Sequence, residues 1–379
     1  MASPAVVAEE PRHYEIANVL RDHAHGLRLT GPQARAVRDI VACRTERLGG
    51  HLEVCPDCGF SRGSYNSCRN RHCPKCQILK QELWAEAQEA LLLPTPYFQI
   101  VFTIPRELHA FFRRAPEVCL TLLFEAVSET LTAVAGTKLK ATIGFTAVLH
   151  TWNQQLGFHP HLHCVVPAGG LSLDDSRWIP TSRRFFLPVK ALRTLFRGKL
   201  LSKIERALRA GEILADLAKD LPLLRRTPKT WNVYAKRPLA GPGHVVRYLS
   251  RYVHRIAIAN SRITAYDGES VTFRYRDRAD RNMTKHHTVS GPDFARLFLQ
   301  HVLPPRFVRI RHYGLLATKR RKDLARCRQL LGAPPATPLE KDASWFVAFE
   351  RLFGTNPLQC PACKTGVLVT TRVLPPMRA

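Results

Sequence analysis

Two histidines that alternate along one segment are the first residues whose spacing suggests chemistry. His161 and His163 stand two residues apart in the string HPHLHCVV. Successive side chains of a strand point to opposite faces, so both imidazoles would share one face and could hold one divalent ion. The preceding predicted strand, residues 141 to 152, contains His150. If Trp152 pairs with His161, then His150 pairs with His163, and all three histidines share a face.

We therefore predict a metal site made of His150, His161 and His163, with His159 as the second choice for the third ligand. His159 is in phase with His161 but lies at the turn beside Pro160. The alternative is plain: two polar residues on a solvated strand face, with no ion between them.

A second set of reactive side chains lies in the segment VVRYLSRYVHRIA. Arranged as a helix, it has Tyr248 and Tyr252 one turn apart at the edge of an apolar stripe. Three arginines form a neighbouring basic stripe: Arg247, Arg251 and Arg255. A phenolate can attack a phosphodiester while a metal ion polarises the phosphoryl oxygens and guanidinium groups hold the flanking phosphates. An amphipathic tyrosine at the margin of a core is the ordinary alternative.

The cysteines are concentrated in the string CPDCGFSRGSYNSCRNRHCPKC. Two CxxC pairs, Cys55/Cys58 and Cys73/Cys76, are separated by 14 residues. Each pair can direct two thiolates at one ion, so the two pairs together predict one tetrahedral structural zinc site. Cys68 and His72 are surplus to that site. They could replace a member of a pair, or join His51 or Cys43 in a second site.

A further CxxC pair stands near the end of the chain. Cys360 and Cys363 form only half of a zinc ribbon, and no Cys or His follows them. The pair could bind a metal together with ligands distant in the sequence, or it could be idle; we favour an idle or partial role. The isolated cysteines are expected to be buried apolar residues: Cys119, Cys164 and Cys327.

The charge of the chain points to a polyanionic partner. Among 379 residues, 57 Lys and Arg face 30 Asp and Glu, a net charge of +27. Nucleic acid is the commonest partner of such a surface, and an anionic membrane is the rival. We find no apolar run approaching the roughly 20 residues that span a bilayer, and no signal-peptide pattern at the start. We expect a cytoplasmic, DNA-associated protein with reduced cysteines.

The elements that must position these residues predict an α+β fold in three parts. Residues 1–95 read as an N-terminal helical and zinc-binding domain. Residues 96–300 combine predicted strands at 98–104, 141–152 and 161–167 with helices at 108–135 and about 190–218. The segment 263–277 reads as a hairpin that turns at Asp267-Gly268. Residues 301–379 form a basic C-terminal region that contains the last CxxC pair.

Several of these motifs together resemble a known family. The strings HPHLHCVVPAGG, YLSRYVHRIAIANSRI, RIRHYGLLA and YNSCRNRHCPKCQ resemble the HUH rolling-circle transposases of the insertion-sequence-91 family, in its two-tyrosine branch. The matches run from about residue 15 to 320. The resemblance implies an antiparallel-sheet HUH endonuclease domain with flanking helices, preceded by a small zinc-binding domain. It also implies that His161 and His163 bind Mg or Mn, and that Tyr248 and Tyr252 are nucleophiles.

The resemblance implies a bacterial transposase that cuts and rejoins single-stranded DNA at transposon ends through a 5′-phosphotyrosine. Tyr248, nearer the arginines, is expected to make the first cut and Tyr252 the second. A basic stretch, 306–328, is expected to track the DNA through Arg309 and Arg311, with Phe307 and Tyr313 stacking on bases.

Two alternatives remain open. One is a plasmid replication initiator or relaxase with the same chemistry. The other is a zinc-dependent DNA-binding regulator without catalysis.

Overall fold

A five-stranded antiparallel sheet forms the centre of the molecule. In this computed structural model the described residues are 14–182, 187–226, 231–239, 245, 257–335, 342 and 344–377. The order of the strands is β13-β5-β6-β3-β9, and every neighbouring pair is antiparallel. The strands are β3 (Tyr97–Thr103), β5 (Gly144–Trp152), β6 (Phe158–Pro167), β9 (Asn232–Leu239) and β13 (Ile310–Gly314).

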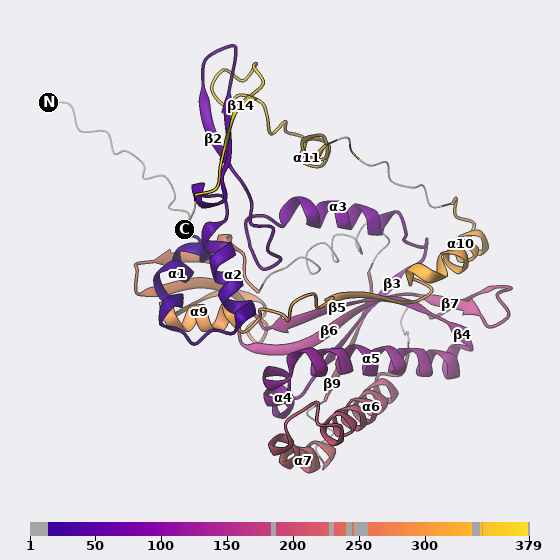
Figure 1. Ribbon diagram of the computed structural model, residues 1–379. Helices are drawn as coiled ribbons and strands as arrows, with labels where there is room; N and C mark the ends of the chain where they lie inside the picture. The colour runs from indigo at the N-terminus through magenta and orange to yellow at the C-terminus, as the bar shows by residue number, and fades with distance from the viewer. Residues whose placement is uncertain are drawn as a thin grey trace.

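One face of this sheet is covered by helices and carries the largest apolar core (Figure 1). The covering helices are α4 (His109–Arg114), α5 (Pro116–Leu139) and α6 (Val189–Arg209), and the short α7 (Leu221–Arg226) adds Leu221 to the same core. Alternation along β6 sends Leu162, Cys164 and Val166 into this core. The face opposite must therefore receive His161 and His163.

Helix α5 differs from the sequence expectation in one respect. It has 24 residues and is long and apolar enough, by length and composition, to cross a membrane. However, 56% of its most apolar window is buried inside the fold, where α5 packs against the sheet and α6. Its apolar character is therefore that of a core helix.

The other face of the sheet carries α3 (Ile78–Glu89) and a smaller apolar cluster. In that cluster Val245 is fully buried with Val148 and Val165, and Trp84 of α3 packs against them. Val148 belongs to the same strand face as His150, and Val165 to the same face as His163, since each pair differs by two residues. Val245 therefore lies on the sheet face that carries the histidines.

The N-terminal helices do not form a core by themselves. Helices α1 (Ile16–His23) and α2 (Gly31–Ala42) pack with α9 (Gly291–Leu299) and a three-stranded sheet. That sheet consists of β10 (Ile263–Tyr266), β11 (Ser270–Asp277) and β12 (Met283–Ser290). The packing thus crosses the expected boundary near 95 and joins residues 257–299 to the start of the chain.

The boundary expected near residue 300 is also crossed. Strand β13 lies beyond it and yet forms the edge of the central sheet, beside β5. Strand β14 (Val369–Leu374) pairs with β1 (Gly50–Val54), whose other neighbour is β2 (Ser61–Tyr65). Figure 1 shows β14 lying along this N-terminal hairpin. The remaining described α-helices and strands are α10 (Arg321–Leu330), α11 (Trp345–Phe353) and a small sheet of β4 (Ala141–Thr142), β7 (Gly169–Ser172) and β8 (Trp178–Pro180).

The α+β class expected from the sequence is confirmed, as are most of the elements named there. The expected hairpin at 263–277 turns as predicted, since Tyr266 pairs with Val271 and Gly268 has a φ of +99°. The third strand of that sheet, β12, was not predicted. Its sequence, MTKHHTVS, has apolar residues only near its two ends, Met283 and Val289.

Candidate functional site

The three predicted histidines lie together on the face of the central sheet opposite α5. A nitrogen from each of His150, His161 and His163 lies within 4.8 Å of the others, a grouping that could hold one metal ion. We call these residues the histidine cluster. His150 and His163 are buried, and His161 is partly exposed. The cluster is therefore held by the paired strands β5 and β6, and His161 is its most exposed member.

The register of the hairpin differs from the expected one. His150 pairs with His161, and Val148 pairs with His163, whereas we expected His150 opposite His163. A register irregularity lies between His150 and Trp152, and Trp152 pairs with Phe158. Because the pairing is displaced by two residues, every side chain keeps its face. The grouping of the three histidines therefore persists despite the wrong register.

His161 is held in one tautomer. Its Nδ1 lies 2.6 Å from the carbonyl oxygen of His159. A carbonyl only accepts, so Nδ1 of His161 donates and carries the ring proton. The lone pair of Nε2 is then available for a cation, which is the usual arrangement of metal-binding histidines. His159, the second choice for a ligand, thus orients the ring of His161 through its backbone.

Sequence reasoning missed a residue that contacts His163. Gln99 of β3 is 1% exposed, and its Nε2 lies 2.7 Å from Nδ1 of His163. The Oε1 atom of the same amide is buried without a hydrogen-bond partner. Rotation of the amide by half a turn would let Oε1 accept a hydrogen from Nδ1 and leave Nε2 of His163 to a metal. The signal was a lone amide within the apolar strand YFQIVFT.

The electrostatic environment favours the uncharged form of two of the three histidines, His161 and His163. Burial lowers the pKa of His161 to about 4 and that of His163 well below its ordinary value. For His163, neighbouring His150 and His161 add to the effect of burial, as do Lys236 and Arg278. Both of these cations are exposed, and neither was singled out from the sequence. Neutral ring nitrogens can bind a cation, and the exposed positive charges beside them suit a phosphate.

The predicted nucleophiles lie outside the described residues. Of the segment 241–256, only Val245 is described. The assignments of Tyr248 and Tyr252, and of the basic stripe Arg247, Arg251 and Arg255, therefore stay predictions.

The basic stretch 306–328 is less open than expected. The side chain of Arg309 lines a small cavity with His72, Thr151 and His301, and burial followed by repulsion from Arg71 lowers its pKa to about 10. The guanidinium carbon of Arg311 lies 4.2 Å from the centre of the Phe124 ring. Both arginines are thus largely engaged with protein groups, and their contact with DNA stays a prediction.

The two aromatic residues of this stretch pack with the core, Phe307 inside it and Tyr313 partly buried against it. Phe307 is 7% exposed and packs near Phe124, and Tyr313 stacks on Phe145 at 4.9 Å between ring centres. The expectation that Phe307 stacks on bases is therefore wrong, because its ring is buried in the core on the α5 face of the sheet, whereas base stacking by the partly exposed Tyr313 stays a prediction.

The cysteines form two groups, and neither is the predicted set of two neighbouring CxxC pairs, although Cys68 does join Cys43, as one of the alternatives had it, and Cys360 and Cys363 are not idle in position but lie with another pair. The first cysteine cluster is Cys43, Cys68, Cys73 and Cys76. The second cysteine cluster is Cys55, Cys58, Cys360 and Cys363. The predicted tetrahedron of Cys55, Cys58, Cys73 and Cys76 is wrong because Cys55 and Cys58 lie at the tip of the β1–β2 hairpin. The chain returns along β2 before it reaches Cys68 at the base of the hairpin, beside Cys43 at the end of α2.

His72 does not join the first cysteine cluster. It is buried, and its Nε2 accepts a hydrogen bond from the backbone N–H of Leu303 at 3.4 Å. The neighbouring Arg71 donates to the carbonyl oxygens of Phe307 and Pro304 at 2.5 and 2.6 Å. These two residues thus fasten the cysteine-rich segment to the loop that leads into β13.

Comparison with known proteins finds a family model for the cysteine-rich N-terminal domain and another for the region that contains the histidine cluster. Residues 15–104 match the family model described as "Transposase zinc-binding domain", and residues 144–323 match one described as "Putative transposase". The first range contains the first cysteine cluster, and the second contains the histidine cluster. The zinc-binding character expected from the cysteines is thereby confirmed for the N-terminal domain.

Two curated relatives extend over nearly the whole chain. The "Putative transposase y4qJ" of Sinorhizobium fredii (strain NBRC 101917 / NGR234) is 42% identical over 95% of each chain. The "Transposase for insertion sequence element IS801" of Pseudomonas savastanoi pv. phaseolicola is 26% identical over 90% of this chain and 84% of the relative. No solved structure matches. With a zinc-binding domain, a transposase domain and relatives of nearly equal length, the chain belongs to the insertion-sequence-91 family of transposases.

Proposed function

We propose that this transposase cuts and rejoins single-stranded DNA at transposon ends by tyrosine attack, in the manner of a rolling-circle HUH enzyme. The histidine cluster would hold Mg²⁺ or Mn²⁺, and Tyr248 and Tyr252 would be the nucleophiles. The observation that carries the proposal is the convergence of three imidazoles on one face of the sheet, with burial lowering the pKa of His161 and of His163.

The position of Val245 supports the placement of the nucleophiles. This residue is buried against Val148 and Val165, on the same sheet face as the histidines. Tyr248 follows Val245 by three residues in the sequence. If the segment forms the helix that its sequence predicts, three residues correspond to just under one turn, about 4.5 Å along the axis. The backbone of Tyr248 would then lie over the same sheet face as the histidine cluster.

The donor set fits a divalent ion with open coordination positions. Three imidazole nitrogens leave places for phosphate oxygens and water, as catalytic metal sites require. Such an ion would polarise the phosphoryl group and stabilise the charge that develops during attack. Mn²⁺ accepts imidazole more readily than Mg²⁺, which prefers oxygen ligands and dehydrates reluctantly.

Side chains of the protein would carry out the attack on phosphorus and hold the DNA. The tyrosine oxygen loses its proton and forms a bond to phosphorus, while the bond from phosphorus to the 3′ oxygen breaks and that oxygen gains a proton. The 5′-phosphotyrosine keeps the energy of the phosphodiester, so a free 3′-OH can reverse the step on another strand. Exposed Lys236 and Arg278 beside the cluster would hold the flanking phosphates by charge.

A covalent-adduct assay tests this function. Labelled single-stranded oligonucleotides, tiled across the sequences that flank the gene, are incubated with the full-length protein and Mn²⁺. A labelled band at the size of the protein on a denaturing gel is the expected result. The variant Y248F/Y252F should bind the same oligonucleotides without forming the band.

Two comparisons make that assay specific. Tyr65→Phe removes a partly exposed phenol in the zinc-binding domain and should leave the adduct unchanged. An adduct that persists in Y248F/Y252F would refute the assignment of the nucleophiles. Cleavage without rejoining to a second oligonucleotide would refute the transfer step.

A further inference from the structure

We propose that the second cysteine cluster holds a structural zinc ion of its own, which clasps the end of the chain to its N-terminal hairpin. The cluster takes Cys360 and Cys363 from a region that neither matched family model covers. This inference does not depend on the chemistry of the histidine cluster.

The spacing of the sulfur atoms fits a metal and not disulfides. The Sγ atoms of Cys55 and Cys363 are 3.8 Å apart, and those of Cys58 and Cys360 are 3.6 Å apart. A tetrahedral zinc ion with Zn–S bonds of about 2.3 Å separates its sulfur atoms by roughly 3.8 Å. A disulfide would require about 2.05 Å. The four thiols therefore lie close enough to be the ligands of one zinc ion placed between them.

Each half of the cluster is built as the same tight turn. In the hairpin half, the N–H of Gly59 donates to the carbonyl oxygen of Cys55 at 2.9 Å. In the C-terminal half, the N–H of Lys364 donates to the carbonyl oxygen of Cys360 at 3.1 Å. Gly59 has a φ of +72° and Lys364 a φ of +64°, so both turns end in a left-handed residue. Two matching turns that face each other indicate a site formed for a ligand shared between them.

Backbone amides complete the surroundings of the thiols. The N–H of Gly366 lies 3.3 Å from Sγ of Cys363, and the amide of Phe60 bonds to the thiol of Cys58. Such N–H groups stabilise thiolates, which are the form that binds zinc. A Cβ atom at Gly366 would collide with Sγ of Cys55. The absence of a side chain at this position therefore lets the two halves approach.

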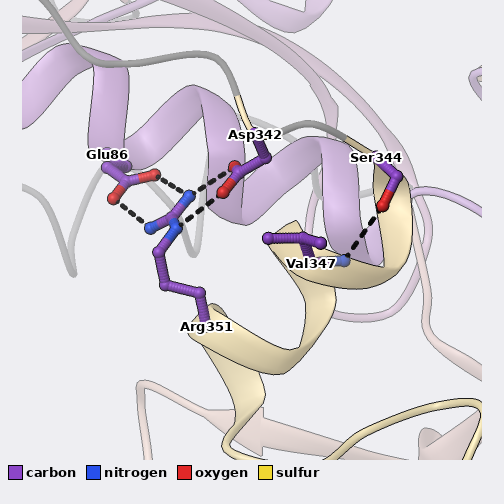
Figure 2. Close-up of polar contacts among 5 residues, drawn as sticks. All are labelled: Glu86, Asp342, Ser344, Val347 and Arg351. Atoms are coloured by element: carbon purple, nitrogen blue, oxygen red, sulfur yellow. Dashed lines mark hydrogen bonds and ion pairs between the residues drawn. The ribbon is translucent and has the colours of Figure 1, made fainter.

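The neighbouring elements show which segments a zinc ion in the second cysteine cluster would hold together. Strand β14 adds to β1 and makes a three-stranded sheet from the two ends of the described chain. Helix α11 lies beside α3, where Arg351 binds both carboxylate oxygens of Glu86 and also Asp342 (Figure 2). This ion pair is exposed and screened by salt, so it is a weak tether. Cys58 and Cys360 are 302 positions apart, and a zinc ion would offset the entropy of closing so long a loop.

Cobalt substitution of the full-length protein tests the clasp. Thiolate-to-cobalt charge-transfer absorption counts sulfur-bound ions and ignores an ion held by histidines. The intact protein should show the absorption of two such centres. C360S/C363S should lose about half of it, and so should C43S/C76S. Cys327→Ala removes a buried cysteine outside both clusters and should lose none.

Further variants guard against a simple failure to fold. Cys363→His supplies another zinc ligand and should retain two cobalt centres, with one thiolate fewer. Gly366→Ala should weaken binding at the second cluster alone. Trypsin should release the C-terminal segment from C360S/C363S but not from Cys363→His. One sulfur-bound centre in the intact protein, or two in C360S/C363S, would overturn the proposal.

Discussion

The histidine cluster and the cysteine clusters differ in how the chain assembles them. The three histidines come from one hairpin, β5 and β6, so strand alternation alone brings them together. Each cysteine cluster draws on segments separated by other elements, and the second joins positions 302 apart. The histidine cluster therefore follows from the pairing of two strands. A metal ion in a cysteine cluster would itself hold distant segments of the chain together.

The donor atoms differ in the same sense. Four thiolates satisfy a tetrahedral ion completely and leave no place for a substrate. Three imidazoles leave positions open, as a reacting phosphate requires. We therefore expect the sulfur-bound ions to determine whether the protein folds, and the histidine-bound ion to determine whether it reacts.

Removing one histidine should give the largest difference between loss of activity and loss of folding. His161→Ala should reduce covalent-adduct formation by about 1000-fold or more, since even a single lost electrostatic contact to a transition state costs about 100- to 1000-fold. The fold should persist because β6 remains paired on both sides. Cleavage rates and circular dichroism measure the two effects. His286→Ala, an exposed histidine on β12, is the matched control. Equal activity of the two variants would remove the distinction between the sites.

Removal of the zinc ion from the first cysteine cluster should act on folding instead of activity. Cys73 is fully buried in the core formed by α1, α2 and α9. Loss of the zinc ion from the first cysteine cluster should remove a stabilisation on the order of 10 kcal/mol from this region. A strong chelator should therefore unfold it, whereas dialysis against metal-free buffer should empty only the histidine cluster. Calorimetry before and after each treatment measures the difference. A chelated protein with an unchanged melting transition would contradict a structural role.

A smaller effect is expected from Gln99, which contacts His163 without touching substrate. Gln99→Leu should raise the Mn²⁺ concentration needed for half-maximal cleavage by about 10- to 100-fold, as loss of a ligand's hydrogen-bond partner does. The rate at saturating Mn²⁺ should largely recover. Gln99→Glu keeps an acceptor for Nδ1 of His163 and should stay close to the original protein. If Gln99→Leu lowers the saturating rate alone, the residue does not position a metal ligand.

The smallest effect concerns the identity of the ion. With three nitrogen donors and no carboxylate in the predicted set, we expect Mn²⁺ to support cleavage at concentrations about 10-fold lower than Mg²⁺. Metal titrations of the initial rate measure this ratio. A lower requirement for Mg²⁺ would indicate an additional oxygen ligand from the protein.

The contrast between the sites also explains what the sequence could predict. The histidine cluster was predictable because period-two alternation survives a register error of two residues. The α+β class and most strands followed from apolar patterns in the same way. The contact between Gln99 and His163 was not predictable, because it depends on which strand lies beside β6, and the chain order does not fix that neighbour.

The predicted grouping of the cysteine pairs was wrong for a related reason. Nearness in sequence favoured joining Cys55/Cys58 to Cys73/Cys76, but β1 and β2 place the first pair at the far end of a hairpin. The partner pair arrives only when β14 returns to β1. Likewise, the packing of α9 on α1 could not be deduced from composition, since both helices simply have one apolar face.

Identification of the residue that carries DNA tests the central claim most directly. The full-length protein is allowed to react with single-stranded end DNA and Mn²⁺, the adduct is digested with nuclease and protease, and the peptides are sequenced by mass spectrometry. The account predicts a nucleotide joined through its 5′ phosphate to Tyr248 or Tyr252, absent when His161 is replaced by Ala. A nucleotide on any other side chain, or cleavage that leaves no nucleotide on the protein, would contradict it.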